Sequence, residues 1–221
     1  MMSEAIELRA KLREHAHAEN AVAMSKYMKN HFSFFGIKSP ERRALANEFL
    51  KENGMLKQPF DRSFVKELWN LPERELQIVA IDYCVKNVKQ MERDDIYLLR
   101  DMITQKSWWD TVDAIASNLV GPLCLKYEDL QNEFIEAWST DEHLWLRRTS
   151  IIYQLGYKAK TDEQALYTYI KRNADSKEFF IQKAIGWALR QYSKTNPESV
   201  RQFIETHELA KLSVREGSKY I

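Results

Sequence analysis

The segment SKEFFIQKAIGWALRQYS, residues Ser176 to Ser193, decides the fold class because its apolar residues recur at helical spacing. The apolar face of this segment comprises Ile181, Ile185, Ala188, Leu189 and Tyr192. Most of the chain shows the same three- and four-residue spacing, and strand-like alternation is almost absent. Only 6 glycines and 5 prolines interrupt it. The sequence therefore predicts an all-α protein.

Helix starts are marked by capping residues and prolines. Ser39-Pro40-Glu41 predicts an N-cap followed by proline at the first helical position, and Leu71-Pro72-Glu73 predicts the next long helix by the same logic. Asn196-Pro197 marks a further start. Other helices are expected to begin near Asp94, Ser107, Asp141, Thr161 and Ser176. These signals predict about a dozen helices, mostly of about 9 to 18 residues.

Three helix openings resemble one another and indicate a repeat. Lys106-Ser107-Trp108-Trp109, Glu142-His143-Leu144-Trp145 and Lys177-Glu178-Phe179-Phe180 follow at intervals of 36 and 35 residues. This period favours stacked helix pairs, and the tetratricopeptide signature is absent, so we expect HEAT-like repeats. The predicted architecture is a right-handed stack forming one domain over residues 1–221, with a concave groove suited to binding.

The composition limits the class of partner. The chain has 221 residues, 44% of them apolar, with 33 basic and 32 acidic side chains. A formal charge of +1 provides no general attraction to polyanions, so an anionic partner needs a local patch. Residues 1–140 hold 19 basic and 22 acidic side chains, whereas residues 141–221 hold 14 and 10. The C-terminal part is therefore the expected anion-binding part.

Cysteines and apolar runs indicate the compartment. Cys84 and Cys124 are isolated in apolar segments, which argues against a disulfide framework or a zinc site. The first residues are charged and lack the apolar region of a leader peptide. No apolar run approaches the roughly 18 residues of a membrane helix. We therefore expect a cytoplasmic protein that does not associate with membranes.

A second stripe runs along the 176–193 segment and just beyond it, at spacings of four, three and four residues. It comprises Lys183, Trp187, Arg190 and Lys194. One interpretation is a solvated charged face whose tryptophan packs on a neighbouring helix. The other is a surface that contacts a nucleic-acid duplex, with cations on phosphates and the indole on sugar or base. The basic surplus of this part favours the second.

Trp109 and Asp113 form a further candidate pair, one helical turn apart and beside an apolar stripe. Asp113 could be an ordinary surface aspartate paired with Arg147 or Arg148 of the next repeat. Placing a carboxylate beside two tryptophans is costly, however, and this favours a functional site. Arg148 occupies the repeat position that Lys183 holds in the next repeat. We expect it to face the groove, with a surface salt bridge as the alternative.

Motifs of other chemistries are missing. The sequence contains no Walker loop, GxGxxG, GxSxG or HExxH, and its five histidines lack ligand spacing. No cofactor and no metal are therefore expected.

Taken in order, several blocks resemble the AlkD-type DNA alkylation-repair glycosylases, a family of HEAT-like repeat proteins. The blocks are residues 27–32, 36–43, 67–75, 106–113, 145–148 and 177–190. The resemblance implies an enzyme of base excision repair that removes cationic alkylated purines, such as N3-methyladenine and N7-methylguanine, from duplex DNA. It implies catalytic roles for Trp109, Asp113 and Trp187. It implies DNA contacts for Tyr27, Arg43, Arg148 and Arg190.

An alkylated purine already carries a positive charge, so it can leave without a general acid. One carboxylate, Asp113, would then suffice to stabilise the oxocarbenium-like sugar. Whether the base is flipped into a pocket or engaged from the backbone side stays open at this stage. We expect a monomer. Two other functions stay open, a non-catalytic DNA-binding relative and a protein-binding helical scaffold.

Overall fold

The computed structural model describes residues 3–221. The N-terminal segment used above to predict that there is no leader peptide begins two residues earlier, and those two residues lie outside the described part. The described residues are helical, joined by turns, with one isolated parallel bridge between Ser33 and Glu73. The all-α prediction is therefore confirmed. Among these residues, no helix is both long enough and apolar enough to cross a bilayer.

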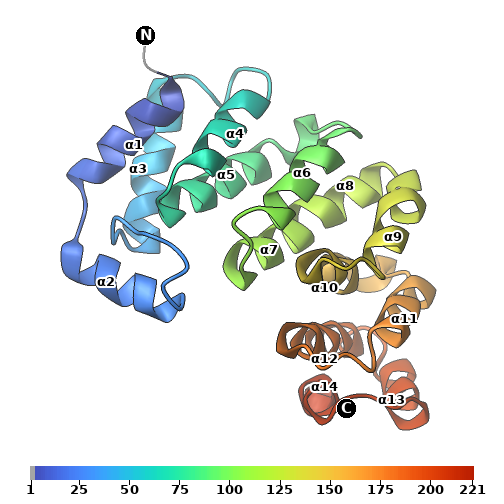
Figure 1. Cartoon of the computed structure of the whole chain (residues 1–221). Coiled ribbons are helices and arrows are strands. Elements are labelled where there is room, and N and C mark those ends of the chain that lie inside the picture. Colours follow the sequence, from blue (N-terminus) through green and yellow to red (C-terminus); the bar gives the residue numbers. More distant parts are fainter. Residues whose placement is uncertain (1–2) are drawn as a thin grey trace. The chain divides into compact units, whose positions relative to one another are not determined.

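The chain divides into two compact units, one reaching to Met91 and one from Glu92 to Ile221. That residues 1–221 form a single domain stays a prediction. The N-terminal unit holds α1 (Glu4–Glu14), α2 (Ala18–Tyr27), α3 (Ser39–Glu52), α4 (Arg62–Asn70), α5 (Arg74–Lys86) and a 3-10 turn (Val88–Gln90). Figure 1 shows α1, α3, α4 and α5 packed together and α2 at one end of this unit.

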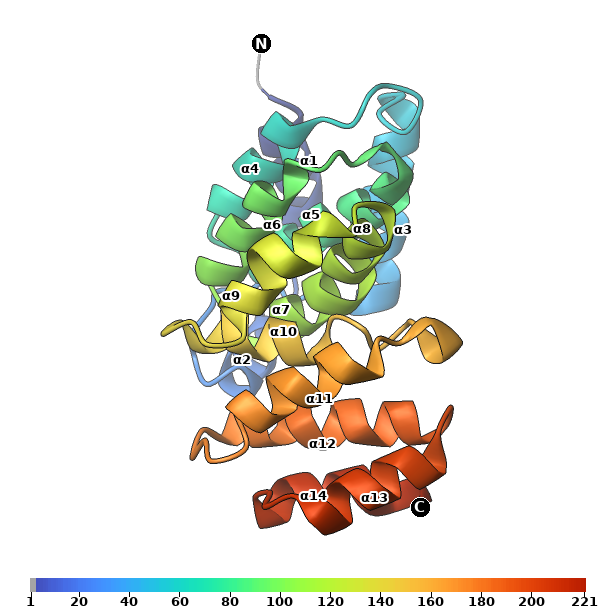
Figure 2. The ribbon, with the colours of Figure 1, turned by 90° about the vertical axis from the view of Figure 1, so that its right-hand side faces the viewer.

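The C-terminal unit is a stack of short helices. It holds α6 (Asp95–Thr104), α7 (Trp109–Ile115), α8 (Gly121–Lys126), α9 (Glu136–Trp138), α10 (Leu144–Ile152), α11 (Glu163–Arg172), α12 (Phe179–Ser193), α13 (Pro197–Thr206) and α14 (Lys211–Gly217). Two π-helical turns, Ala116–Val120 and Gln131–Ile135, and two 3-10 turns, Lys158–Lys160 and Ser218–Tyr220, complete it. In both views α12 lies between α10 and α11 on one side and α13 and α14 on the other (Figures 1 and 2).

The repeat openings correspond to three helices of this stack. α7, α10 and α12 begin at Trp109, Leu144 and Phe179, which are 35 residues apart in each case. Their starts lie two or three residues later than the capping signals indicated, because Trp108, His143 and Glu178 still have extended backbone. Helix boundaries of this kind commonly vary by one or two residues.

One of the three proline signals lies where predicted, since Pro197 is the first residue of α13 and is capped by the Asn196 side chain. In α3 the N-cap is Lys38 and not Ser39, so Ser39 is the first helical residue and Pro40 the second. Pro72 is different, because α5 begins only at Arg74. The residues before that helix stay extended, since Glu73 pairs with Ser33 in the isolated bridge and the Pro72 carbonyl accepts a hydrogen bond from the Ser33 hydroxyl.

The core of the C-terminal unit confirms the apolar face of α12. Ile181, Ile185, Ala188 and Leu189 are buried in one cluster with side chains of α10, α11 and α13, and Tyr192 packs against that cluster. Each buried side chain of leucine size stabilises the fold by about 1.5 to 3 kcal/mol. This face fixes the rotation of α12, so its second stripe must point elsewhere.

Candidate active site

The second stripe of α12 faces a cavity of about 320 Å³ in the C-terminal unit. Lys183, Trp187 and Arg190 all line it. Trp187 is partly buried and packs against the hydrophobic cluster, as the first interpretation expects, and its contact with a duplex stays a prediction. Lys194 does not line the cavity. It lies exposed near the end of the helix, with its ammonium over the Tyr220 ring.

Helices α7 and α10 supply further lining residues of this cavity. Trp109 and Asp113 project from α7, and Arg148 projects from α10. The remaining lining residues are Phe179, Phe180 and Glu216. The fold therefore gathers the predicted catalytic residues Trp109, Asp113 and Trp187 at one cavity, from segments up to 78 residues apart in sequence.

The repeat explains how these groups come to face one another. Asp113, Arg148 and Lys183 are each the fifth residue of their helix, in α7, α10 and α12 respectively. Stacked repeats place equivalent positions side by side. One acidic and two basic side chains therefore occupy equivalent positions in three successive repeats.

Asp113 and Arg148 form a bidentate ion pair. Arg148 Nε donates to Asp113 Oδ1 at 2.7 Å, and Nη2 donates to Oδ2 at 2.8 Å. Arg148 Nη1 donates to the Phe180 carbonyl. Arg148 is only 4% exposed, and all three of its nitrogens have an acceptor within the protein. The DNA contact predicted for Arg148 thus stays a prediction, beside the clear observation that it holds Asp113.

Burial dominates the electrostatics of this carboxylate. It raises the pKa of Asp113 above the ordinary value of 3.8, while the hydrogen bonds and charge of Arg148 oppose that rise. The Asp113 side chain keeps 16% of its exposure, compared with 5% for Arg148. The carboxylate is therefore the member of the pair that a ligand in the cavity can reach.

An aromatic cluster lies behind the ion pair. The rings of Trp108, Trp145 and Phe180 contact one another, with centroid separations of 5.8 Å, 5.2 Å and 4.9 Å. The Arg148 guanidinium lies 5.8 Å from the Phe180 ring centroid. Edge-to-face and tilted aromatic contacts of this kind stiffen a wall, since the rings pack at fixed angles. Phe180 was quoted only as part of the repeat opening, and its role here was not predicted.

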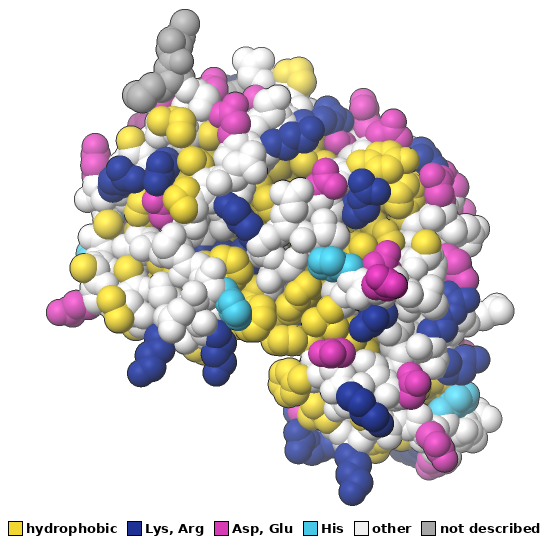
Figure 3. Space-filling model, viewed as in Figure 1, with side chains coloured by type: hydrophobic (Ala, Val, Ile, Leu, Met, Phe, Trp, Pro, Cys, Tyr) yellow, Lys and Arg dark blue, Asp and Glu magenta, His cyan; other side chains and the backbone are white. Residues whose placement is uncertain are grey.

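Glu216 of α14 is the second residue that sequence analysis missed. Its carboxylate lies 2.8 Å from Arg190 Nη1, 2.8 Å from Lys219 Nζ and 3.5 Å from Lys183 Nζ. The Lys219 hydrogen bond and the neighbouring lysine charges lower its pKa to about 2. Figure 3 shows Lys and Arg side chains over the end of the unit that α12 and α14 form. Glu216 thus pairs with three basic side chains, those of Lys183, Arg190 and Lys219, and holds them close together.

A glycine makes this arrangement possible. A Cβ at Gly186 of α12 would stand 2.5 Å from the Glu216 Cβ, which is closer than atoms of folded proteins approach. The backbone of α12 therefore packs at this point directly against the Glu216 side chain and the Ser213 backbone of α14. The contact places Glu216 beside Lys183 and Arg190, one turn to either side of the glycine.

Tyr27 and Arg43 belong to the N-terminal unit. Tyr27, at the end of α2, is 70% exposed and lines a separate cavity of about 410 Å³ in that unit. Arg43 is exposed on α3. Among residues 3–221, no three His, Cys, Asp or Glu side chains are grouped so that they could hold a metal ion.

Comparison with known proteins identifies the family. The family model for DNA alkylation repair enzymes matches residues 8–221. The chain belongs to this family. A DNA alkylation repair enzyme acts on DNA, so the cavity with its adjoining basic side chains belongs to a protein whose substrate is a polyanion.

Solved structures agree with this assignment to the family. A protein described as a predicted DNA alkylation repair enzyme from Enterococcus faecalis is 37% identical, with a TM-score of 0.83 over 93% of this chain and 96% of that one. The smu.31 protein of Streptococcus mutans UA159 is 17% identical, with a TM-score of 0.61 over 81% of this chain and 97% of its own. The second likeness shows the fold alone. No curated protein matches the sequence.

Proposed function

We propose that this protein is a DNA glycosylase that hydrolyses the N-glycosidic bond of cationic alkylated purines in duplex DNA. The observation that carries the proposal is one reachable carboxylate, Asp113, held by Arg148 in a cavity that Trp109 and Trp187 also line. N3-methyladenine and N7-methylguanine are the proposed substrates. The enzyme uses no metal and no nucleotide cofactor, and acts as a cytoplasmic monomer whose 221 residues form one domain.

The chemistry needs only one acid because of the charge on the substrate. A purine alkylated at N3 or N7 leaves as a neutral base, so its departure needs no proton donor. As the bond breaks, positive charge moves onto the deoxyribose. Asp113 stabilises that charge, because a fixed carboxylate in a partly dry cavity interacts more strongly than one in water. The same carboxylate orients the attacking water.

Arg148 acts as a positioning residue in this mechanism. Arg148 Nε and Nη2 hold the two carboxylate oxygens of Asp113. The Phe180 carbonyl accepts a hydrogen bond from the third nitrogen, Nη1, and so holds the guanidinium itself. A group held this way loses little freedom when the transition state forms. Trp109 and Trp187 exclude water and present electron-rich faces to a cationic nucleotide, at about 0.5 to 2 kcal/mol for each contact.

DNA is held by the basic side chains. Lys183, Arg190 and Lys194 follow one face of α12 and neutralise phosphates near the cavity. Tyr27 and Arg43 supply further contacts from the N-terminal unit. Each phosphate neutralised adds roughly 0.9 to the salt dependence of binding.

The decisive experiment is the release of methylated bases. The purified protein is incubated with a duplex that carries a single N7-methylguanine, and free base and abasic sites are measured. Asp113→Asn keeps the shape of the side chain and removes its charge. We expect it to lower the excision rate by a factor of about 100 or more, with little change in affinity for DNA.

Each alternative has its own outcome in this assay. A non-catalytic DNA-binding relative would bind the duplex with strong salt dependence and release no base. A protein-binding scaffold would neither bind the duplex nor release a base. If Asp113→Asn weakened binding and spared turnover, Asp113 would be a binding residue and the mechanism would be wrong.

A further inference from the structure

α2 is unusual in the N-terminal unit because none of its residues is buried. A helix without an apolar face in the core has to be held by other means. Its start is tied by the His17 amide, which donates to the Phe35 carbonyl at 2.8 Å. Its last turn is tied by the Ser25 hydroxyl, which donates to the Phe32 carbonyl at 2.9 Å. Both partners lie in the segment 31–37 that follows α2.

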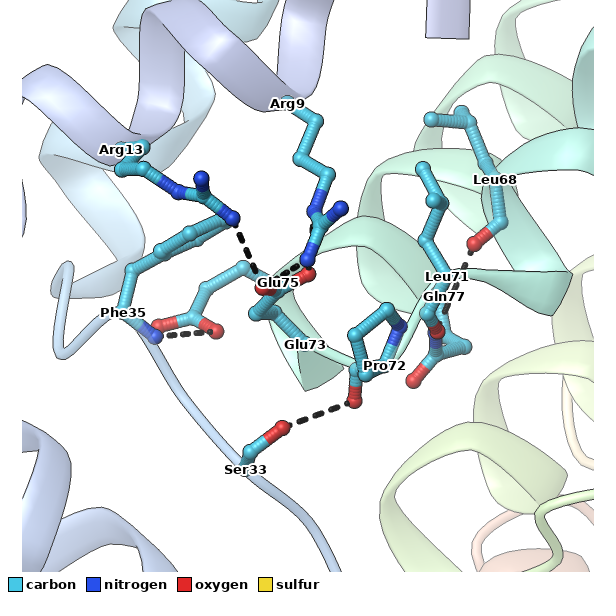
Figure 4. A network of polar contacts seen from close by, with 10 residues as sticks. All are labelled: Arg9, Arg13, Ser33, Phe35, Leu68, Leu71, Pro72, Glu73, Glu75 and Gln77. Atoms are coloured by element: carbon cyan, nitrogen blue, oxygen red, sulfur yellow. Dashed lines mark hydrogen bonds and ion pairs between the residues drawn. The ribbon is translucent and has the colours of Figure 1, made fainter. Parts of the chain in front are cut away.

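That segment is itself fastened to the start of α5. The Arg74 amide donates to the Ser33 carbonyl at 2.9 Å, and the Arg74 guanidinium lies 3.7 Å from the centroid of the Phe32 ring. The Glu75 carboxylate accepts hydrogen bonds from three successive amides, those of Phe35, Gly36 and Ile37, at 3.1 Å, 2.9 Å and 3.2 Å. Figure 4 shows Glu75 reaching the Phe35 amide beneath Arg9 and Arg13.

Glu75 is fully buried, which makes these bonds consequential. Burial raises the pKa of Glu75, and the three amide hydrogen bonds oppose that rise. Burying a carboxylate costs free energy unless its oxygens accept hydrogen bonds. The amides of the loop supply these bonds, and the carboxylate in turn restrains the loop. Because three successive amides bond to one side chain, Glu75 restrains the backbone of residues 35–37.

Gly36 transmits this position to α2. Its φ of +88° suits glycine, and a Cβ at this residue would lie 2.2 Å from the His17 carbonyl oxygen and 2.6 Å from the Ala21 nitrogen. The loop and the first turn of α2 therefore meet backbone to backbone. A movement of residues 35–37 has to move the start of α2.

We propose that Glu75 is a positioning residue for DNA binding, which acts through residues 35–37 to set the position of α2 and of Tyr27 on it. This inference rests on the proposed function only in that Tyr27 contacts DNA. The hydrogen bonds described above link Glu75 to the backbone of residues 35–37 and not to a side chain of α2. The carboxylate acts through backbone amides, so its effect depends on its two oxygens and not on its charge at long range.

The first test uses Glu75→Gln with Glu73→Gln as the matched control. Glutamine keeps one oxygen and replaces the other with a donor, so at least one buried amide loses its acceptor. Glu73 lies two residues earlier and pairs with Arg9 and Arg13, so its substitution removes the same charge without touching the loop amides. Gly36→Ala displaces α2 by a different route and shows whether the effect belongs to the loop.

The first readout is amide hydrogen exchange in the absence of DNA. We expect exchange in α2 to rise about tenfold or more in Glu75→Gln and Gly36→Ala, with α1 and α3 unchanged in these two variants. In Glu73→Gln, exchange in α2 should match the wild type. The second readout is the Kd for an unmodified duplex. It should rise several-fold in the two loop variants, and the excision rate at saturating DNA should stay unchanged.

The third readout is a double-mutant cycle with Tyr27→Ala. If Glu75 acts through Tyr27, the loss of affinity from Glu75→Gln should largely vanish in the Tyr27→Ala background. Unchanged α2 exchange, additive losses of affinity, or an equal effect from Glu73→Gln would each overturn the proposal. A wild-type protein that binds the duplex and releases no base would overturn the glycosylase activity and leave this result standing.

Discussion

Asp113 is the residue on which the proposed chemistry depends, and its environment sets when it can work. Two effects on the pKa of Asp113 oppose each other, because burial favours the neutral acid and Arg148 favours the carboxylate. Removing one member of a buried pair costs about 3 to 5 kcal/mol, since the other is left without a partner. Arg148 therefore matters both to stability and to the charge of the acid.

This balance predicts the acid limb of the pH profile. Excision needs ionised Asp113, so the rate should fall on acidification through a pKa above 3.8, the ordinary value for aspartate. Arg148→Ala removes the group that lowers this pKa, and the limb should move to higher pH. Arg147→Ala is the control, because Arg147 bonds the Asp141 carbonyl and not Asp113. Single-turnover rates from pH 4 to 8, roughly the range in which a raised aspartate pKa would be visible, measure the shift. If the acid limb of the Arg148→Ala profile stayed at the wild-type pH, the prediction would be wrong.

Arg190 is expected to contribute to DNA binding through its charge. Its side chain is a quarter exposed beside the cavity, so Arg190→Ala should weaken duplex binding and reduce the salt slope by about one. Arg201 on α13 is an exposed arginine outside the cavity lining, and Arg201→Ala should leave the slope unchanged. Fluorescence titrations at several salt concentrations give both slopes. Equal effects of the two substitutions would remove Arg190 from the binding surface.

At the scale of elements, α14 contributes more than a cap for the last repeat. The close contact at Gly186 sets Glu216 against the basic side chains of α12, and this ties the two helices by charge as well as by packing. Glu216 is ionised in the folded protein down to an unusually low pH, because its pKa lies at about 2. The contact between α12 and α14 should therefore depend on pH.

The sign follows from the direction of that shift. A carboxyl whose pKa is lowered on folding stabilises the folded state fully above its ordinary pKa of 4.5, and the contribution is lost as the pH falls towards about 2. Glu216→Gln should thus be less stable than the wild type at pH 6, and the difference should disappear near pH 2. Glu198→Gln, at a highly exposed acid of α13, should show no difference at either pH. Urea midpoints measure both. A pH-independent deficit in Glu216→Gln would show that packing alone accounts for it.

At the scale of the whole molecule, the charges available to chemistry limit the substrate. The described cavity holds two carboxylates, and one of them, Glu216, is neutralised by three cations. Glu216 is not a proton donor at neutral pH, because its pKa lies at about 2, and the proposed mechanism uses Asp113 in its ionised form. Under the proposed mechanism, the cavity therefore favours leaving groups that bring their own positive charge.

This predicts a strict preference for charged lesions. Hypoxanthine and uracil leave as neutral bases only after protonation, so duplexes that carry them should be cleaved at least about 100 times more slowly than one with N7-methylguanine. The rates are compared in one sequence context under single-turnover conditions. Comparable rates for hypoxanthine would require a proton donor and would refute the single-carboxylate mechanism.

The helices and their faces could be predicted from sequence because both depend on near neighbours. The two stripes of α12 are visible in 3.6-residue spacing, and the structure places the apolar stripe in the core and three residues of the other at the cavity. Pro72 misled the prediction, because the Ser33–Glu73 bridge keeps the residues around it extended. That bridge joins segments far apart in the chain, and local rules do not describe it.

The partners of the site residues depended on the tertiary structure. Glu216 and Phe180 carry no local signal, since a lone acid in a short helix and an aromatic at a helix start are common anywhere. Arg148 was predicted to face the groove, with a salt bridge as the alternative, and only the structure shows that its guanidinium pairs with Asp113. The helices, their apolar faces and the repeat follow from local sequence alone, because hydrogen bonding and side-chain spacing within a helix depend on near neighbours. Only the packing of one repeat on the next decided which charges meet, because electrostatic pairing depends on distances in space that the order of residues does not contain.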